Sequence, residues 1–122
     1  MSWHAGSCHC GAVRFRVRLD TYAALDCNCS ICRKKGFLHL LVEREDFEWL
    51  AGQDAISTYT FNTHTAQHTF CSTCGMHPFY VPRSHPEGID VNARALDDIP
   101  VSAFEVTGFD GAHWEENVET IR

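Results

Sequence analysis

Residues 6–20 read GSCHCGAVRFRVRLD, and two patterns in this stretch decide the fold. Cys8 and Cys10 are separated by one residue and followed by Gly11, which is typical of a tight turn that presents two thiolates to one metal ion. From residue 13 to residue 19, apolar residues then alternate with arginines. A period of two predicts a β-strand with one buried face. The three arginines would form either a solvated outer face, the simpler interpretation, or an anion-binding row.

The rest of the chain predicts further strands and little helix. Segments rich in aromatic and β-branched residues alternate with turn-forming residues, as in successive hairpins. One short C-terminal helix is predicted over residues 111–119, with Asp110 as its cap and with Trp114 and Val118 on one face. The expected strands cover residues 11–20, 37–42, 47–50, 56–61, 67–70, 89–93 and 101–107. The sequence therefore predicts a single, mainly β domain over residues 1–122.

Composition argues against several classes of protein. The chain has 122 residues, of which 44% are hydrophobic, and this is enough for a compact core. It lacks both a run of about 20 apolar residues and the start of a secretory signal, so we expect a cytoplasmic protein without a membrane partner. With a formal net charge of -6, it is poorly suited to phosphate backbones. A nucleic-acid partner is therefore not expected.

Seven cysteines form three clusters with the spacing of metal ligands. In a reducing cytosol, such a dense set of thiols indicates metal binding or catalysis rather than disulfide bonds. Two thiolates one or two residues apart can bind one ion, and two such pairs close a tetrahedral zinc site. The clusters are Cys8-x-Cys10, Cys27-x-Cys29-x-x-Cys32 and Cys71-x-x-Cys74. The simplest division joins the first and last clusters into a closed structural site.

The middle cluster then remains as a triplet of Cys27, Cys29 and Cys32. Three protein ligands with one exchangeable position are the general pattern of catalytic zinc, so two zinc sites are expected. Alternatively, a histidine could complete a second structural site. The chain has eight histidines, and those nearest to cysteines or strand ends are His9, His39, His68 and His77. The sequence assigns none of them to metal.

The three clusters and the residues around them resemble the glutathione-dependent formaldehyde-activating enzyme family. The resemblance covers nearly the whole chain, and it is specific because all seven cysteines fall in register with flanking glycines. The segments that carry it are residues 6–15 (GSCHCGAVRF), 27–36 (CNCSICRKKG) and 69–75 (TFCSTCG). Within the family, residues 58–64, 66–71 and 79–84 look like the centromere protein V branch.

This resemblance implies a fold and a chemistry. The fold would be a β-tent similar to Mss4, built of antiparallel sheets with zinc-knuckle turns. The reaction would join formaldehyde to glutathione, giving S-hydroxymethylglutathione, and its reverse is a carbon–sulfur lyase activity. Arg33, Lys34 and Lys35 directly follow the triplet and could attract the carboxylates of glutathione. The implied ligands are Cys8, Cys10, Cys71 and Cys74 for a structural zinc, and Cys27, Cys29 and Cys32 for a catalytic zinc.

Two functions from different classes therefore stay open. The first is a zinc-dependent carbon–sulfur lyase that acts on glutathione or a related thiol adduct. In that case an incoming thiol can strip a loosely held ion, so the second zinc site can be partly occupied. The second is a zinc-stabilised, non-catalytic protein-binding module. The fourth ligand at the triplet separates them, because a protein side chain there favours the module and water or a thiol favours the enzyme.

Overall fold

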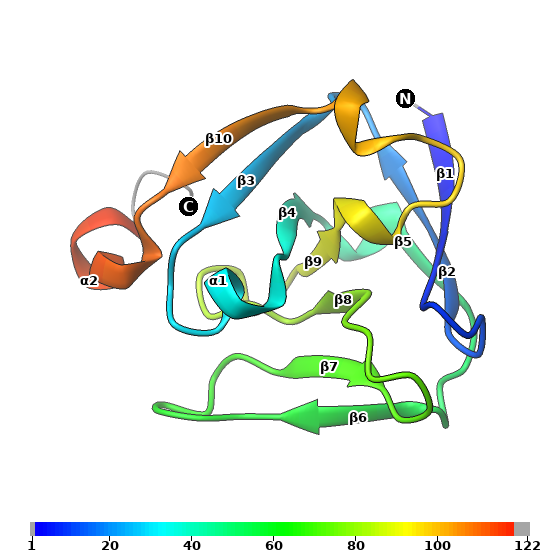
Figure 1. Cartoon of the computed structure of the whole chain (residues 1–122), viewed down its shortest axis with the longest axis horizontal. Coiled ribbons are helices and arrows are strands. Elements are labelled where there is room, and N and C mark those ends of the chain that lie inside the picture. Colours follow the sequence, from blue (N-terminus) through cyan, green and yellow to red (C-terminus); the bar gives the residue numbers. More distant parts are fainter. Residues whose placement is uncertain (1, 119–122) are drawn as a thin grey trace.

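The computed structural model describes residues 2–118, and Figure 1 shows sheets that lean against one another in a tent-like arrangement. Within this range ten strands form three sheets, and the helices are short. The predicted mainly β fold is confirmed. Among the described residues, no helix is long and apolar enough to cross a membrane.

The first sheet contains the strand predicted from the opening stretch. It is antiparallel and has the order β1 (Ser2–Ser7), β2 (Arg14–Leu19) and β5 (Phe47–Ala51). Phe15 and Val17 on β2 are fully buried, as their alternation predicts. On the other face, Arg16 Nη2 lies 2.6 Å from Glu48 Oε2, and Arg18 forms an ion pair with Asp46. These pairs favour a solvated outer face over an anion-binding row.

The second sheet has five strands in the order β10-β3-β4-β9-β8. Its strands are β3 (Ala23–Cys27), β4 (Leu38–Val42), β8 (Phe79–Tyr80), β9 (Ile89–Asn92) and β10 (Glu105–Phe109). All neighbours pair antiparallel except β10 and β3, which are parallel. The strand predicted over residues 101–107 begins later than expected, because Val101–Ala103 form a 3-10 turn. A separate hairpin of β6 (Ile56–Tyr59) and β7 (His68–Cys71) lies beneath this sheet in Figure 1.

The helical segments are single turns. The α-helices are α1 (Cys32–Lys35) and α2 (Trp114–Asn117), and the other 3-10 turns are η1 (Arg44–Asp46), η2 (Ala93–Ala95) and η4 (Gly111–His113). The predicted C-terminal helix is thus η4 followed by α2, and Glu119 lies outside the described residues. Asp110 stands at the predicted N-cap position, but its side chain makes no capping hydrogen bond. Its carboxylate instead accepts a hydrogen bond from Asn28 and lies 2.9 Å from His113 Nδ1.

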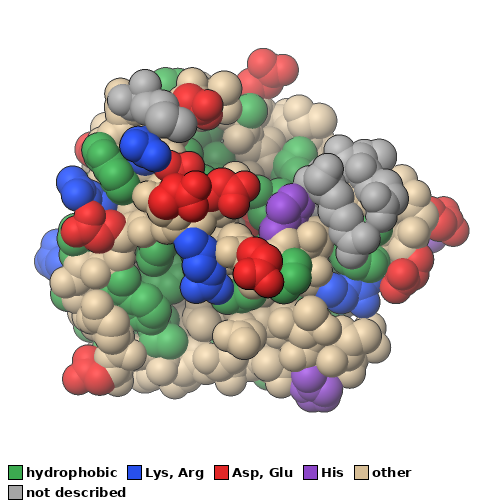
Figure 2. All heavy atoms as spheres, turned by 180° about the vertical axis from the view of Figure 1, so that it is seen from behind, with side chains coloured by type: hydrophobic (Ala, Val, Ile, Leu, Met, Phe, Trp, Pro, Cys, Tyr) green, Lys and Arg blue, Asp and Glu red, His purple; other side chains and the backbone are tan. Residues whose placement is uncertain are grey.

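The hydrophobic core lies between the first two sheets. Phe15 packs against Phe47 and Phe79, with ring centroids 5.6 and 5.3 Å apart, and Trp49 meets Phe79 edge to face at 5.0 Å. Gly6 is required beside this cluster, because a Cβ there would overlap the ring of Phe15. On the face drawn in Figure 2, basic side chains lie next to acidic ones.

Candidate functional site

The first candidate metal centre is a group of four thiols. Two come from the turn between β1 and β2, and two come from the end of β7 and the turn that follows it. We call Cys8, Cys10, Cys71 and Cys74 the four-thiol group, and their Sγ atoms all lie within 4.8 Å of one another. The Sγ of Cys10 is 3.6 Å from that of Cys8 and 3.7 Å from that of Cys71. The structure thus brings together the two clusters that the sequence pairs. This donor set fits zinc, for which four thiolates are one of the common closed tetrahedral sites.

The backbone around the four-thiol group forms two knuckle turns. Gly11 and Gly75 have φ of 80° and 76°, a region that glycine adopts without strain. The amide of Val13 donates a hydrogen bond to Cys8 Sγ at 3.3 Å. Backbone amides of Cys10 and Met76 also lower the pKa of Cys74 from 9.0 to about 6. These amides therefore favour the thiolate form of Cys74, which is the form that binds metal.

The second candidate metal centre lies where β3, α1 and β4 meet. The Sγ atoms of Cys27 and Cys32 and a ring nitrogen of His39 lie within 4.8 Å of one another, and all three residues are buried. Cys29, which is only half-buried, accepts a hydrogen bond from the Cys32 amide at 3.3 Å. The neighbouring thiols of Cys27 and Cys32 lower the pKa of Cys29. The structure thus brings two cysteines of the predicted triplet together with His39, and Cys29 lies beside this group.

The four candidate histidines have different surroundings. His9 is exposed, and His77 is half-buried. His68 Nδ1 lies 3.0 Å from Lys35 Nζ. Only His39 among the four belongs to a metal-binding group of the described residues. Sequence reasoning could name His39 but not select it, because its neighbours in space lie on other strands.

A cavity of about 590 Å³ adjoins the second centre. Its floor is one face of the five-stranded sheet, to which every strand contributes: Phe109 from β10, Leu25 and Cys27 from β3, His39 and Leu41 from β4, Asp90 from β9, and Tyr80 from β8. Strand register explains this, because paired residues point to the same face and Leu25 pairs with His39, Leu41 with Asp90 and Asp90 with Tyr80. Cys29 and Cys32 also line the cavity.

The other walls come from segments distant in sequence. The loop after β6 contributes Phe61, Asn62 and Thr63, and residues 82–84 and 111–115 supply much of the rest. Arg83 lies over the ring of Trp114, with Cζ 3.4 Å from the centroid, and its Nη2 is 3.3 Å from Glu115 Oε1. The ring contact and the ion pair fix the position of the Arg83 guanidinium beside the cavity.

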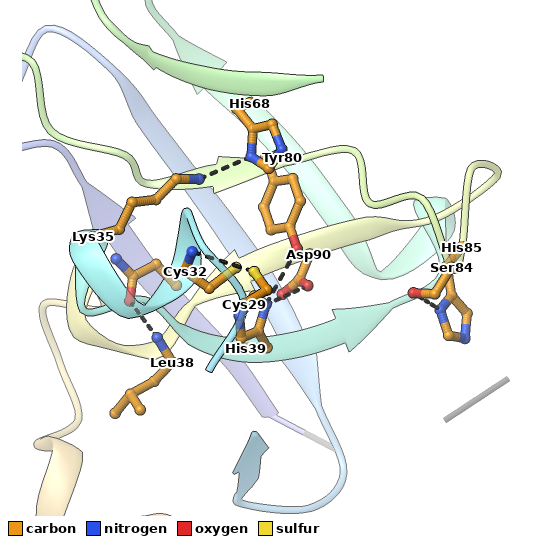
Figure 3. A network of polar contacts seen from close by, with 11 residues as sticks. Cys29, Cys32, Lys35, Leu38, His39, His68, Tyr80, Ser84, His85 and Asp90 are labelled. Atoms are coloured by element: carbon orange, nitrogen blue, oxygen red, sulfur yellow. Dashed lines mark hydrogen bonds and ion pairs between the residues drawn. The ribbon is translucent and has the colours of Figure 1, made fainter. Parts of the chain in front are cut away.

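A buried polar cluster connects the cavity floor to the second centre (Figure 3). His39 Nδ1 lies 2.7 Å from Asp90 Oδ2 and 3.4 Å from the Tyr80 hydroxyl. Asp90 is only 2% exposed. Burial raises the pKa of Tyr80 well above its ordinary value, so its hydroxyl stays protonated at neutral pH.

The three basic residues after the triplet point to different places. Arg33 lines the main cavity, whereas Lys34 and Lys35 line a separate shallow depression with Tyr59, Phe61 and His77. In Figure 3 the Lys35 ammonium points toward His68. Burial lowers the pKa of Lys35, and burial followed by the charge of Lys35 lowers that of His68 to about 4. Neutral His68 therefore accepts a hydrogen bond from Lys35.

With this geometry in place, comparison with known proteins decides the family. The sequence model of the glutathione-dependent formaldehyde-activating enzymes matches residues 3–109, which includes all seven cysteines. The chain belongs to this family. Family membership agrees with the two thiol-rich centres and with a cavity beside one of them.

Two relatives support this assignment. A Halomonas elongata protein that carries the name of the family is 36% identical over 105 residues, which is 78% of this chain and 67% of that protein. The crystal structure of a Rhodobacter sphaeroides protein superimposes with a TM-score of 0.78 and 36% sequence identity, covering 86% of this chain and 99% of that one. The fold is thus shared with the Rhodobacter sphaeroides protein.

Proposed function

We propose that this protein is a zinc-dependent carbon–sulfur lyase that acts on glutathione or a related thiol adduct. In the synthetic direction, the thiol sulfur bonds to the carbonyl carbon of formaldehyde, and the thiol proton ends on the carbonyl oxygen. In the lyase direction the same carbon–sulfur bond breaks. The name of the family supports glutathione and formaldehyde as reactants.

The cavity at the second centre carries this proposal. Its volume of about 590 Å³ falls within the roughly 300–1,000 Å³ typical of small-molecule sites. Cys27, Cys29 and Cys32 all line it, so a bound thiol can reach the metal donors. The four-thiol group, by contrast, already offers the full set of donors for a closed zinc site. We therefore assign catalysis to the triplet and structure to the four-thiol group.

The residues present fit zinc at both centres, because thiolates and imidazole are the donors that it prefers. Zinc bound at the triplet would lower the pKa of an incoming thiol and keep it as a nucleophilic thiolate. Holding formaldehyde and the thiol in one cavity raises their effective concentration. The Tyr80 hydroxyl, kept protonated by burial, is a hydrogen-bond donor on the cavity floor.

Two arginines are placed to bind the carboxylates of glutathione. Arg33 follows the triplet on α1, and Arg83 stands on the far wall with its guanidinium over Trp114. Arginine is well suited to carboxylates because its planar guanidinium can donate two parallel hydrogen bonds. The anchoring role that the sequence predicts for Arg33, Lys34 and Lys35 therefore rests mainly on Arg33.

We also propose that the chain belongs to the centromere protein V branch of the family. All three segments that resemble this branch line the cavity: residues 58–64 supply Phe61, residues 66–71 supply His68 and residues 79–84 supply Arg83. The branch would then differ from the rest of the family in the shape of the cavity.

Composition favours a cytoplasmic location and a single domain over residues 1–122.

Thiol–formaldehyde exchange measured by NMR tests the lyase. The zinc-loaded protein should accelerate exchange between free glutathione and its hydroxymethyl adduct above the spontaneous rate, and Cys29→Ser should remove most of that acceleration. Metal analysis before and after a glutathione soak adds a second readout, with two zinc ions per chain expected to fall toward one. An exchange rate equal to background, and unchanged by Cys29→Ser, would leave the protein-binding module as the better description.

A further inference from the structure

We infer that His39 is a ligand of the metal bound at Cys27 and Cys32, coordinating through Nε2 while Asp90 holds Nδ1. Ligation by His39 depends on the metal centre of the proposed function but not on its reaction. The sequence pattern alone points to three cysteine ligands, and the tertiary structure adds an imidazole.

Strand order places His39 at this centre. β4 lies between β3, which ends at Cys27, and β9, which carries Asp90. His39 therefore has a thiol-bearing strand on one side and a carboxylate-bearing strand on the other, with Cys32 arriving from α1. The three donor atoms of Cys27, Cys32 and His39 lie within 4.8 Å of one another, a separation that a single tetrahedral ion can span.

The two nitrogens of His39 have different partners. Asp90 Oδ2 lies 2.7 Å from Nδ1, so the carboxylate accepts a hydrogen bond from Nδ1–H and leaves the lone pair of Nε2 free. Nε2 is buried, and no hydrogen-bond partner for it is found among residues 2–118. An unpaired nitrogen in a 6% exposed residue is costly unless another group satisfies it. A metal ion held by Cys27 and Cys32 would be such a group.

Asp90 matches the partner that metal-bound histidines usually have. A carboxylate, a backbone carbonyl or water commonly accepts the second N–H of the ring, which fixes the tautomer and strengthens the donor nitrogen. Asp90 is almost fully buried, and its Oδ1 also lacks a partner within the described part of the chain. A buried carboxylate without a second partner is stabilised when the ring that it holds gains positive charge from a metal.

This assignment gives Cys29 a distinct position. Cys27, Cys32 and His39 are buried, whereas Cys29 is half-buried and lies outside that set of mutually close donors. With His39 as a ligand, the lyase needs its open position at Cys29, the donor that an incoming thiol would most easily replace. A centre in which Cys29 stays bound beside His39 is closed, as the non-catalytic module requires. A neutral imidazole in place of a thiolate also leaves the metal less electron-rich, which favours acceptance of an external thiolate.

X-ray absorption at the zinc edge tests ligation directly, without a catalytic assay. A coordinated imidazole ring gives outer-shell scattering that thiolates do not give. We expect this signal in the zinc-loaded wild-type protein and expect it to disappear in His39→Gln. His68→Gln is the matched control, because His68 is also buried and lines the same cavity, and it should leave the signal intact. No imidazole scattering in the wild type, or scattering that survives His39→Gln, would overturn the inference.

Asp90→Asn keeps the inference testable if His39→Gln fails to fold. This variant retains the size of the side chain but removes the negative charge behind the ring. Competition with a chelator should show zinc affinity at the second centre reduced about 10- to 100-fold, with the four-thiol group unaffected. Equal affinity in wild type and Asp90→Asn would count against the inference. Imidazole scattering without exchange activity would contradict the lyase but support His39 as a ligand. Exchange activity without imidazole scattering would contradict His39 as a ligand but support the lyase.

Discussion

Gly111 lies directly against Cys27, so that a Cβ built on Gly111 would overlap the Sγ of Cys27 and stand 3.0 Å from the Cβ of Cys29. The turn that contains Gly111 is tied to the cysteine loop by Asn28. The side chain of Asn28 donates to Asp110 Oδ1 at 3.0 Å and accepts from the Ala112 amide at 2.8 Å. The second centre therefore depends on a glycine that is 84 residues away from Cys27 in the sequence.

We predict that Gly111→Ala weakens the second metal centre. The added methyl group must displace the thiol of Cys27 or move the turn, and donor geometry at zinc tolerates little displacement. Zinc affinity at this centre should fall by at least about tenfold, as for other changes next to metal ligands. Titration with a chromophoric chelator measures this loss.

Gly108→Ala is the matched control for that variant. Gly108 lies on β10 three residues before Gly111, and nothing stands within 4 Å of a Cβ built there. Its zinc affinity should equal that of the wild type. Equal affinities in all three proteins would contradict the importance of the contact between Gly111 and Cys27.

Cys74→Ala should unfold or aggregate the protein, whereas Cys29→Ser should not. The four-thiol group joins the N-terminal turn to the hairpin, and structural zinc sites contribute on the order of 10 kcal/mol that is coupled to folding. That is comparable with the total stability of about 5–15 kcal/mol of a typical domain. Thermal melts of both variants with added zinc check this, and a soluble Cys74→Ala protein with a normal melting temperature would contradict it.

Arg33 and Lys34 form a matched pair for substrate binding. Both are exposed and adjacent on α1, but only Arg33 lines the main cavity. Arg33→Ala should raise KM for glutathione by up to roughly fivefold, because an exposed ion pair contributes up to about 1 kcal/mol. kcat should change little, since this contact is made in the ground state and the transition state alike. An equal effect of Lys34→Ala would point to general attraction by charge instead.

The stability of the protein should fall between pH 6.5 and pH 4 in part because of His68. Burial and Lys35 lower the pKa of His68 from 6.5 to about 4 in the folded state. Between these two pKa values His68 is protonated in the unfolded chain but neutral in the folded chain, so a fall in pH favours unfolding. His68→Gln should therefore show a smaller loss of melting temperature across the window at fixed excess zinc. Parallel curves for the two proteins would show that His68 makes no such contribution.

Local patterns in the sequence were sufficient for much of the fold. The alternation of Phe15 and Val17 with arginines identified β2 and its buried face, because a strand turns successive side chains to opposite sides. The sequence did not identify β1, β3, β8 or α1. β8 has only two residues and α1 a single turn, so neither is long enough to show a period, and both are stabilised by tertiary contacts.

The sequence by itself determined which thiols can share an ion within each cluster, because one- and two-residue spacings fix the reach of a tight turn. Only the tertiary structure decided what stands opposite the second cluster. His39 and Asp90 are 51 residues apart and meet because β4 and β9 are neighbours in the sheet. Strand order depends on how all the buried surfaces pack together. The residues next to His39 in the sequence therefore do not predict which strands become the neighbours of β4. A histidine in an apolar strand has the same local sequence whether or not a carboxylate and two thiols lie next to it in the folded protein.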